Sequence, residues 1–283
     1  MQAIRAGART LIEGKLARSM GMVEPRRLAS SGKFYATRGL GKAASSLSRA
    51  RARRSRTPLT PGAFTVLTVN WNTLEYLEVV VEAVRRFSPG AEIIVVDNAS
   101  RDDSRSYLKQ APVRWLPVPI NLGHGPAMDL ATRLVGTEYF VTLDVDAFPV
   151  SPDWLDVLRG HLEAGIEVVG GRLYRSFAHP SLMAMRTQRF RDRNHTFIRS
   201  AWRSSEDFVH GESWDVGELI SRREEPNVAL IEASEVRGPG VIGTVYGGIV
   251  YHNGVSAHGR AENRAEGLSA WNEARARFLG NPS

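Results

Sequence analysis

Short apolar runs alternate with amphipathic stretches of helical spacing between Phe64 and Glu163, and this alternation restricts the fold more than any other feature of the chain. Four runs have the length and the β-branched or aromatic content of buried strands: Phe64–Val69, Glu92–Val96, Val113–Pro117 and Glu138–Leu143. The helical segments run from Asn72 or Thr73 to about Phe87, from Asp102 or Asp103 to about Gln110, from Gly125 to Leu134, and from Ser151 as N-cap to about Glu163. Strands and helices in this order form βαβ units, so the sequence predicts an α/β fold with a mainly parallel central sheet flanked by helices.

The second half of the chain is less regular. Further strands and helices are predicted at Gly165–Gly171, Trp214–Arg222, Val228–Ile231, Val241–Tyr251 and Ala261–Leu279. The stretch Arg172–Arg203 is rich in Arg, His and Ser, and we expect it to be mobile or to face a substrate, with plainly solvated arginines as the alternative.

Polar residues follow each of the first four predicted strands. Ligands of open α/β sheets bind outside the carboxyl ends of the strands, so these residues are expected to meet at one edge. They are Asn70, Asn72, Asp97, Asn98, Asn121, Asp144 and Asp146, together with Gly123 in the turn after the third strand.

Asp144 and Asp146 stand one residue apart directly after the fourth strand. Two carboxylates in such a place can hold a hard divalent cation through oxygen, and the cation can hold a diphosphate. An Asp-x-Asp pair also arises by chance as a solvated strand end. The other residues at this edge therefore have to decide whether the pair binds a cation.

The strand-end motifs resemble, in order and spacing, those of inverting glycosyltransferases of the GT-A fold, the family 2 group. The matching segments are residues 67–72, 95–104, 121–127 and 143–146. The resemblance covers about residues 63–160 well and continues weakly to about 260. It implies a glycosyltransferase with a nucleotide-sugar donor (UDP-, GDP- or dTDP-linked), working in the synthesis of a bacterial glycan or glycoconjugate.

Several donor-site roles are implied by the same resemblance. Asp97 falls where the family contacts the base or ribose, and Asn121 and Gly123 fall where the chain approaches the donor. Asp144 would contact ribose or a metal-bound water, and Asp146 would coordinate Mn²⁺ or Mg²⁺. Asn70, Asn72 and Asn98 complete the expected donor site; simple turn chemistry is the alternative for these polar residues.

A histidine near the C-terminus is the candidate third metal ligand. His252 lies in a segment similar to a late His-x-x-Gly-x-Ser element of the family, although it has one residue fewer before Gly254. His258 is its rival.

Inversion requires a carboxylate that takes the proton of the acceptor hydroxyl. The candidates are Glu212, Asp215 and Glu218, with Asp215 preferred. The segment departs from the commoner Glu-Asp pair of the family, and an acid at a helix N-terminus is the structural alternative.

Two other classes of protein are compatible with parts of this pattern. A nucleotidyltransferase shares the architecture and metal use, but the loop Asn70–Glu75 lacks the glycines and basic residues of a triphosphate loop. A noncatalytic protein that keeps the fold is the other alternative. The acceptor is open: a glycan, a lipid-linked molecule or a small molecule.

The basic charge of the chain belongs to its N-terminal part. Of 37 basic and 30 acidic residues, residues 1–57 hold 14 and two, which leaves 23 basic and 28 acidic residues in the remainder. We therefore expect a basic arm over residues 1–60, flexible or amphipathic helical, with residues 44–57 as a flexible linker, and a catalytic domain over 61–283 with a donor half (61–160) and an acceptor half (161–283). The arm favours a solvated tail or a peripheral membrane contact over nucleic-acid binding.

Composition and hydropathy limit the cellular setting. The chain has no cysteine, which excludes disulfides and thiolate metal sites. No apolar run reaches the roughly 18 residues of a spanning helix. We expect a cytoplasmic protein, with the inner face of the membrane as the alternative location.

Overall fold

The structure is a computed structural model of the chain and describes residues 39–47, 50, 58–173, 175–198, 208–209, 212–213, 215–236, 243–254 and 261–280. The chain divides into two compact units, residues 1–40 and 41–283, and the second contains the central sheet and its helices. Most of the predicted basic arm, Trp214 and His258 lie outside the described residues, and the predicted domain boundary at residue 60 stays a prediction.

Seven strands form the central sheet. They are β1 (Thr60–Asn70), β2 (Glu92–Asn98), β3 (Arg114–Val118), β4 (Thr137–Thr142), β6 (Val168–Gly171), β7 (Met183–Arg186) and β10 (Val228–Ile231). Their order is β10-β6-β7-β4-β1-β2-β3. Strands β3, β2, β1 and β4 run parallel, as do β6 and β10, whereas β7 is antiparallel to both β4 and β6. The predicted α/β fold with a mainly parallel central sheet is confirmed.

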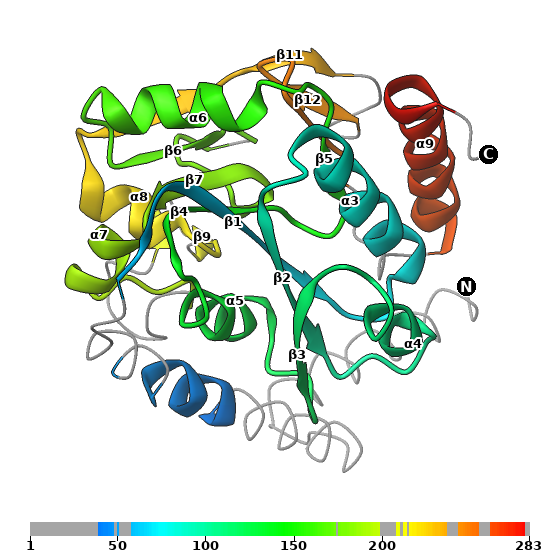
Figure 1. The fold of residues 1–283 in the computed structure, drawn as a ribbon, viewed down its shortest axis with the longest axis horizontal. Coiled ribbons are helices and arrows are strands. Elements are labelled where there is room, and N and C mark those ends of the chain that lie inside the picture. The colour runs from blue at the N-terminus through cyan, green and yellow to red at the C-terminus, as the bar shows by residue number, and fades with distance from the viewer. Residues whose placement is uncertain are drawn as a thin grey trace, which may run out of the picture. The chain divides into compact units, whose positions relative to one another are not determined.

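Helices cover both faces of this sheet (Figure 1). They are α3 (Leu74–Phe87), α4 (Ser104–Leu108), α5 (His124–Thr132), α6 (Trp154–Glu163), α7 (Thr187–Asp192), α8 (Glu218–Glu224) and α9 (Ala261–Leu279). Successive residues of a strand point to opposite faces, so Val66 of β1 joins the apolar core with α3, α6 and α9, and Leu67 joins the core with α5, α7 and α8. The sheet is thus buried on both sides, and its carboxyl edge is left for polar groups.

A smaller antiparallel sheet completes the domain. It contains β5 (Ala147–Pro149), β11 (Ala233–Val236), β12 (Thr244–Tyr246) and β13 (Val250–His252), in the order β11-β12-β13-β5. The register pairs His252 with Ala147, and the backbone amide of Asn253 donates to the carbonyl oxygen of Asp146 at 2.8 Å. This pairing brings a late segment of the chain against the strand end that carries the two aspartates. Two short strands, β8 (Phe208–Val209) and β9 (Glu212–Ser213), pair antiparallel. They lie between α7 and α8 in the sequence.

The prediction for Arg172–Arg203 was wrong over most of its described length. Within it, β7 is a buried strand in the middle of the central sheet, and a 3₁₀ turn (Pro180–Leu182) and α7 flank it. The Arg, His and Ser content concealed the apolar run Leu182–Met185, whose side chains are all buried.

Other predicted elements needed smaller corrections. Val241–Tyr251 is not one strand: β12 and β13 pair as a hairpin, because Gly247 and Gly248 take positive φ values of 52° and 73° in the turn. The helix expected at Trp214–Arg222 begins at Glu218, and the N-cap of α6 is Asp153 and not Ser151.

Residues 39–47 are helical, although a flexible linker was predicted from residue 44. Alanines 43 and 44 favour a helix, and the hydroxyl of Ser45 donates to the buried carboxylate of Asp129 on α5. Among the described residues, no helix is both long and apolar enough to cross a bilayer.

Candidate active site

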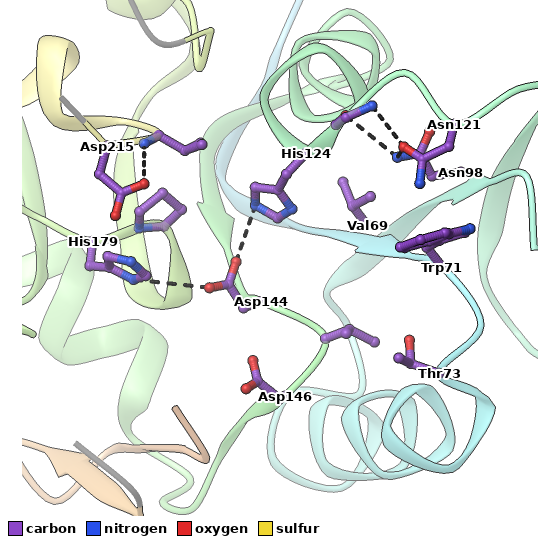
Figure 2. Close-up of a pocket in the computed structure, with 14 residues that line it drawn as sticks. Val69, Trp71, Thr73, Asn98, Asn121, His124, Asp144, Asp146, His179 and Asp215 are labelled. Carbon is purple, nitrogen blue, oxygen red and sulfur yellow. Dashed lines mark hydrogen bonds and ion pairs between the residues drawn. The ribbon is translucent and has the colours of Figure 1, made fainter. Parts of the chain in front are cut away.

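A cavity of about 530 Å³ opens at the carboxyl edge of the parallel strands. Residues from the ends of β1, β2 and β4, from the start of α5 and from the segments before β7 and α8 line it (Figure 2). These include Trp71, Asn98, Asn121, Gly123, His124, Asp144, Asp146, His179 and Asp215. The structure therefore brings together most of the polar residues that the sequence placed at this edge.

One end of the cavity is formed by Trp71, Asn98 and Asn121 (Figure 2). The Asn98 amide donates to Asn121 Oδ1 at 3.0 Å, and Asn98 Oδ1 accepts from the backbone amide of Leu122 at 2.9 Å. Gly123 then opens α5 with φ at 88°, a value that favours glycine. The two amide side chains thus fix the turn before α5, and the Trp71 side chain remains 37% exposed beside them.

Three predicted donor-site residues support this end from behind and do not line the cavity. Asn70 is buried and donates to Ser100 Oγ at 3.1 Å, and Asn72 Oδ1 accepts from the backbone amide of Arg101 at 2.6 Å. The buried Asp97 carboxylate accepts from Arg105 Nε at 2.6 Å. The predicted contact of Asp97 with a base or ribose stays a prediction.

Asp144 lies in the middle of the cavity between two histidines (Figure 2). Its Oδ1 is 3.2 Å from His124 Nε2, and its Oδ2 is 3.9 Å from His179 Nδ1. Burial lowers the pKa of His124, but the hydrogen bond and charge of Asp144 outweigh burial, so the pKa is raised overall. The positive charge of His124 in turn keeps the pKa of Asp144 well below its usual range, against the effect of burial.

His179 differs from His124 in charge. Burial lowers its pKa to about 4, so its ring is neutral in neutral solution and its contact with Asp144 is not an ion pair there. The 3₁₀ turn holds the ring, because the Ser181 backbone amide donates to His179 Nδ1 at 3.2 Å.

Asp144, Asp146 and His252 offer one ligand atom each within 4.8 Å of one another. His252 Nε2 is 3.6 Å from Asp146 Oδ1. Burial lowers the pKa of His252, but the charges of Asp146 and Asp144 outweigh burial and raise it overall. The two carboxylate oxygens suit Mn²⁺ or Mg²⁺, and the imidazole nitrogen can supply a third ligand, so this group fits a divalent cation of the kind that the sequence implied.

The three candidate bases have different surroundings. Asp215 lines the cavity, next to Val216, whose backbone amide donates to the Asp215 carboxylate at 2.7 Å. Glu218 is fully buried in α8, and its carboxylate lies 3.1 Å from Arg175. Glu212 belongs to β9, and its side chain lies outside the described part of the structure.

His179 and His124 both line the cavity, although neither was among the candidate site residues and no sequence signal pointed to their contacts with Asp144. The signal for His124 was its place in the Asn121–Gly125 turn beside the expected donor site. His179 lies in the stretch that was expected to be mobile or to face a substrate, and no strand end pointed to this residue in particular.

Comparison with known proteins gave one match to a family. The sequence profile described as Glycosyl transferase family 2 matches residues 65–214 of this chain. No curated protein matches the chain.

Solved structures with a similar fold share little sequence with this chain. The S. aureus TarS fragment 1–349, in complex with UDP-GlcNAc, is 14% identical at a TM-score of 0.47, over 76% of this chain and 67% of that one. The mannosyltransferase PcManGT from Pyrobaculum calidifontis, in complex with GDP-Man and Mn²⁺, is 15% identical at 0.45, over 86% and 74%. The glucosyl-3-phosphoglycerate synthase from Mycobacterium tuberculosis, in complex with Mn²⁺, UDP and phosphoglyceric acid, is 19% identical at 0.38, over 44% and 56%.

The family profile covers more than half of the 283 residues and includes all four strand-end motifs, so the chain belongs to glycosyl transferase family 2. It is an enzyme of the glycosyltransferase class, as the order of the motifs predicted. The family match leaves the nucleotidyltransferase and noncatalytic alternatives without support.

Proposed function

We propose that this enzyme moves a sugar from a nucleoside diphosphate to an acceptor hydroxyl with inversion at the anomeric carbon, aided by a divalent cation. The observation that carries the proposal is the grouping of Asp144, Asp146 and His252 in and beside a cavity of about 530 Å³ that is also lined by a further carboxylate, Asp215. Family membership supports the reaction class, and the residues support the metal and the base.

The donor nucleotide would occupy the end of the cavity formed by Trp71, Asn98 and Asn121. An indole that is 37% exposed presents an aromatic face on which a base can stack, and the fixed amides beside it shape the slot. The ion pair of Asp97 and Arg105 lies behind this slot and would support it.

The diphosphate would then lie toward Asp144 and Asp146. Asp146 and His252 would hold the cation with Asp144, and His124 at the N-terminus of α5 would keep the Asp144 carboxylate ionised and oriented. The cation would stabilise the negative charge that builds on the leaving diphosphate.

Asp215 is the best placed of the three candidate bases. It lines the cavity beside His179, at the end away from Trp71 (Figure 2), where an acceptor would enter. An ionised carboxylate at that point can take the proton of an acceptor hydroxyl as its oxygen attacks the anomeric carbon. Glu218, buried against Arg175, has no access to a substrate in this arrangement.

The stereochemical course can be tested without knowing the acceptor. The enzyme is incubated with Mn²⁺ and UDP-, GDP- or dTDP-sugars, and slow donor hydrolysis is followed by proton NMR of the anomeric signal. An α-linked donor should release the β-sugar first. Initial release of the α-sugar would contradict inversion, and the absence of turnover for every donor would contradict the proposed substrate class.

A further inference from the structure

Four hydrogen-bonded side chains, of which Ser181, Tyr246 and His252 are buried, connect the proposed cation position to His179 in the cavity lining. His252 Nδ1 lies 3.2 Å from the Tyr246 hydroxyl, and that hydroxyl lies 3.2 Å from Ser181 Oγ. Ser181 Oγ lies 2.9 Å from His179 Nδ1. Tyr246 and Ser181 are fully buried and His252 is 3% exposed, so the two hydrogen bonds of Tyr246 are shielded from water. These hydrogen-bonded side chains join the third candidate ligand to the histidine beside Asp215.

The direction of the hydrogen bonds at His179 is fixed. The Ser181 backbone amide can only donate, and it donates to His179 Nδ1 at 3.2 Å. His179 Nδ1 therefore carries no proton, and the Ser181 hydroxyl must also donate to it at 2.9 Å.

The remaining hydrogen bonds follow from this start. Because the single proton of the Ser181 hydroxyl points to His179, its oxygen can only accept from Tyr246. The Tyr246 hydroxyl then uses its own proton on Ser181, so its oxygen accepts from His252. His252 is thereby protonated at Nδ1, which leaves Nε2, 3.6 Å from Asp146 Oδ1, as the nitrogen that can bind a cation.

We propose that Tyr246 is a positioning residue, which holds His252 in the Nδ1-protonated tautomer and directs its Nε2 lone pair to the cation. The inference rests on the proposed function, since it assumes the cation site of Asp144, Asp146 and His252. Ligand histidines commonly donate their second ring nitrogen to such an outer partner, and loss of the partner weakens metal binding by about 10- to 100-fold.

A glycine leaves the space that the Tyr246 ring fills. Gly171, the last residue of β6, lies against it, and a Cβ added there would come within 2.8 Å of the ring carbons. The ring also stacks on the His252 imidazole, with centroids 6.0 Å apart and planes inclined by 21°. These contacts hold the hydroxyl between Ser181 and His252.

The test is Mn²⁺ binding to Tyr246→Phe, which keeps the ring and removes the hydroxyl. Binding is followed through the electron paramagnetic resonance signal of free Mn²⁺, for the protein alone and with UDP, GDP or dTDP added. Tyr139→Phe is the matched control, because it removes a buried hydroxyl that accepts from Arg186 at 3.0 Å, far from the cation ligands in the fold. Ser181→Ala, which removes the acceptor of Tyr246, is a second route if Tyr246→Phe fails to fold. Thermal unfolding is recorded for each variant.

We expect the Kd of Mn²⁺ to rise about 10- to 100-fold in Tyr246→Phe, to rise in Ser181→Ala, and to stay at the wild-type value in Tyr139→Phe. Wild-type affinity in both Tyr246→Phe and Ser181→Ala, with binding lost in Asp146→Asn, would overturn the role of Tyr246 and leave the cation site standing. Equal affinity in the wild type and Asp146→Asn would instead contradict the cation site itself, and this inference with it.

Discussion

The side chain of Glu218 accepts a hydrogen bond from the backbone amide of Asp215, with 3.0 Å between Glu218 Oε2 and the amide nitrogen. Gly217 makes the tight return between them possible, with φ at 79°. Glu218 is fully buried and paired with Arg175, whereas Asp215 lines the cavity. Two acids three residues apart thus differ in what they can do: one can meet a substrate, and the other holds the segment that presents it.

Asp215→Asn should lower the rate of sugar transfer by about 10²- to 10⁴-fold, because the variant cannot take the acceptor proton. The affinity for a nucleoside diphosphate should stay unchanged, since the base does not contact it. Steady-state rates and calorimetric binding measure the two quantities separately. Asp156→Asn, which removes a 71% exposed carboxylate on α6, is the control. Wild-type rates in Asp215→Asn would assign the base to another residue.

Glu218→Gln should act mainly on stability. The variant leaves Arg175 without its buried counter-charge, and breaking a buried ion pair costs about 3 kcal/mol. Urea unfolding at neutral pH gives the free energy of unfolding. If Glu218→Gln folds as stably as the wild type and yet loses transfer, Glu218 and not Asp215 would be the base.

Trp71→Ala should weaken nucleoside diphosphate binding and spare the fold. A stacked indole contributes about 1 to 3 kcal/mol to binding a base, which corresponds to a roughly 5- to 150-fold change in Kd. Trp71→Phe should recover part of the affinity. Ile120→Ala is the control, because Ile120 is equally exposed at 37% but does not line the cavity. An unchanged Kd in Trp71→Ala would place the base elsewhere.

The surroundings of Glu224 predict how the free energy of unfolding depends on pH. It is 2% exposed and accepts from Arg189 Nη2 at 2.7 Å and from His195 Nε2. Burial raises the pKa of Glu224, but the hydrogen bonds of Arg189 and His195 outweigh it and lower the pKa overall. Since the folded-state pKa lies below the unfolded value of about 4.3, this carboxylate contributes stability above pH 4.3 that is lost as the pH falls through the folded pKa.

Denaturant unfolding at a series of pH values between about 3 and 7 tests this relationship. Glu224→Gln should be less stable at neutral pH by about 3 kcal/mol, and the difference from the wild type should shrink as the solution is acidified. Glu163→Gln, on the exposed side of α6, controls for removal of a carboxyl group. A constant difference over the whole range would show that Glu224 does not carry the acid sensitivity.

The first half of the fold could be predicted because its strands contain buried apolar runs, such as Ile93–Val96 of β2, and because α3 has an apolar face opposite a polar one. The grouping of polar residues at the carboxyl ends of β1, β2 and β4 could also be predicted, because parallel strands bring their ends to one edge. The strand predicted at Val228–Ile231 and the helix predicted at Ala261–Leu279 have the same bounds as β10 and α9.

The remainder depended on contacts that the local sequence does not encode. β7 is only four residues long and lies among arginines, so its place between β4 and β6 follows from the sheet and not from its own pattern. The approach of His252 to Asp146 depends on the register of β13 against β5, which joins residues about a hundred positions apart. The position of Tyr246 beside His252 depends on the turn that joins β12 and β13.

The most direct test of the proposed function is nucleoside diphosphate-sugar binding with and without Mn²⁺, measured by thermal unfolding of the wild type and Asp146→Asn. A ligand that binds only the folded state raises the unfolding temperature by mass action. We predict that at least one of the UDP-, GDP- and dTDP-sugars stabilises the wild type in the presence of Mn²⁺, and that the metal-dependent part is lost in Asp146→Asn. Stabilisation that is the same with and without Mn²⁺, or that survives unchanged in Asp146→Asn, would contradict a cation held by Asp144, Asp146 and His252.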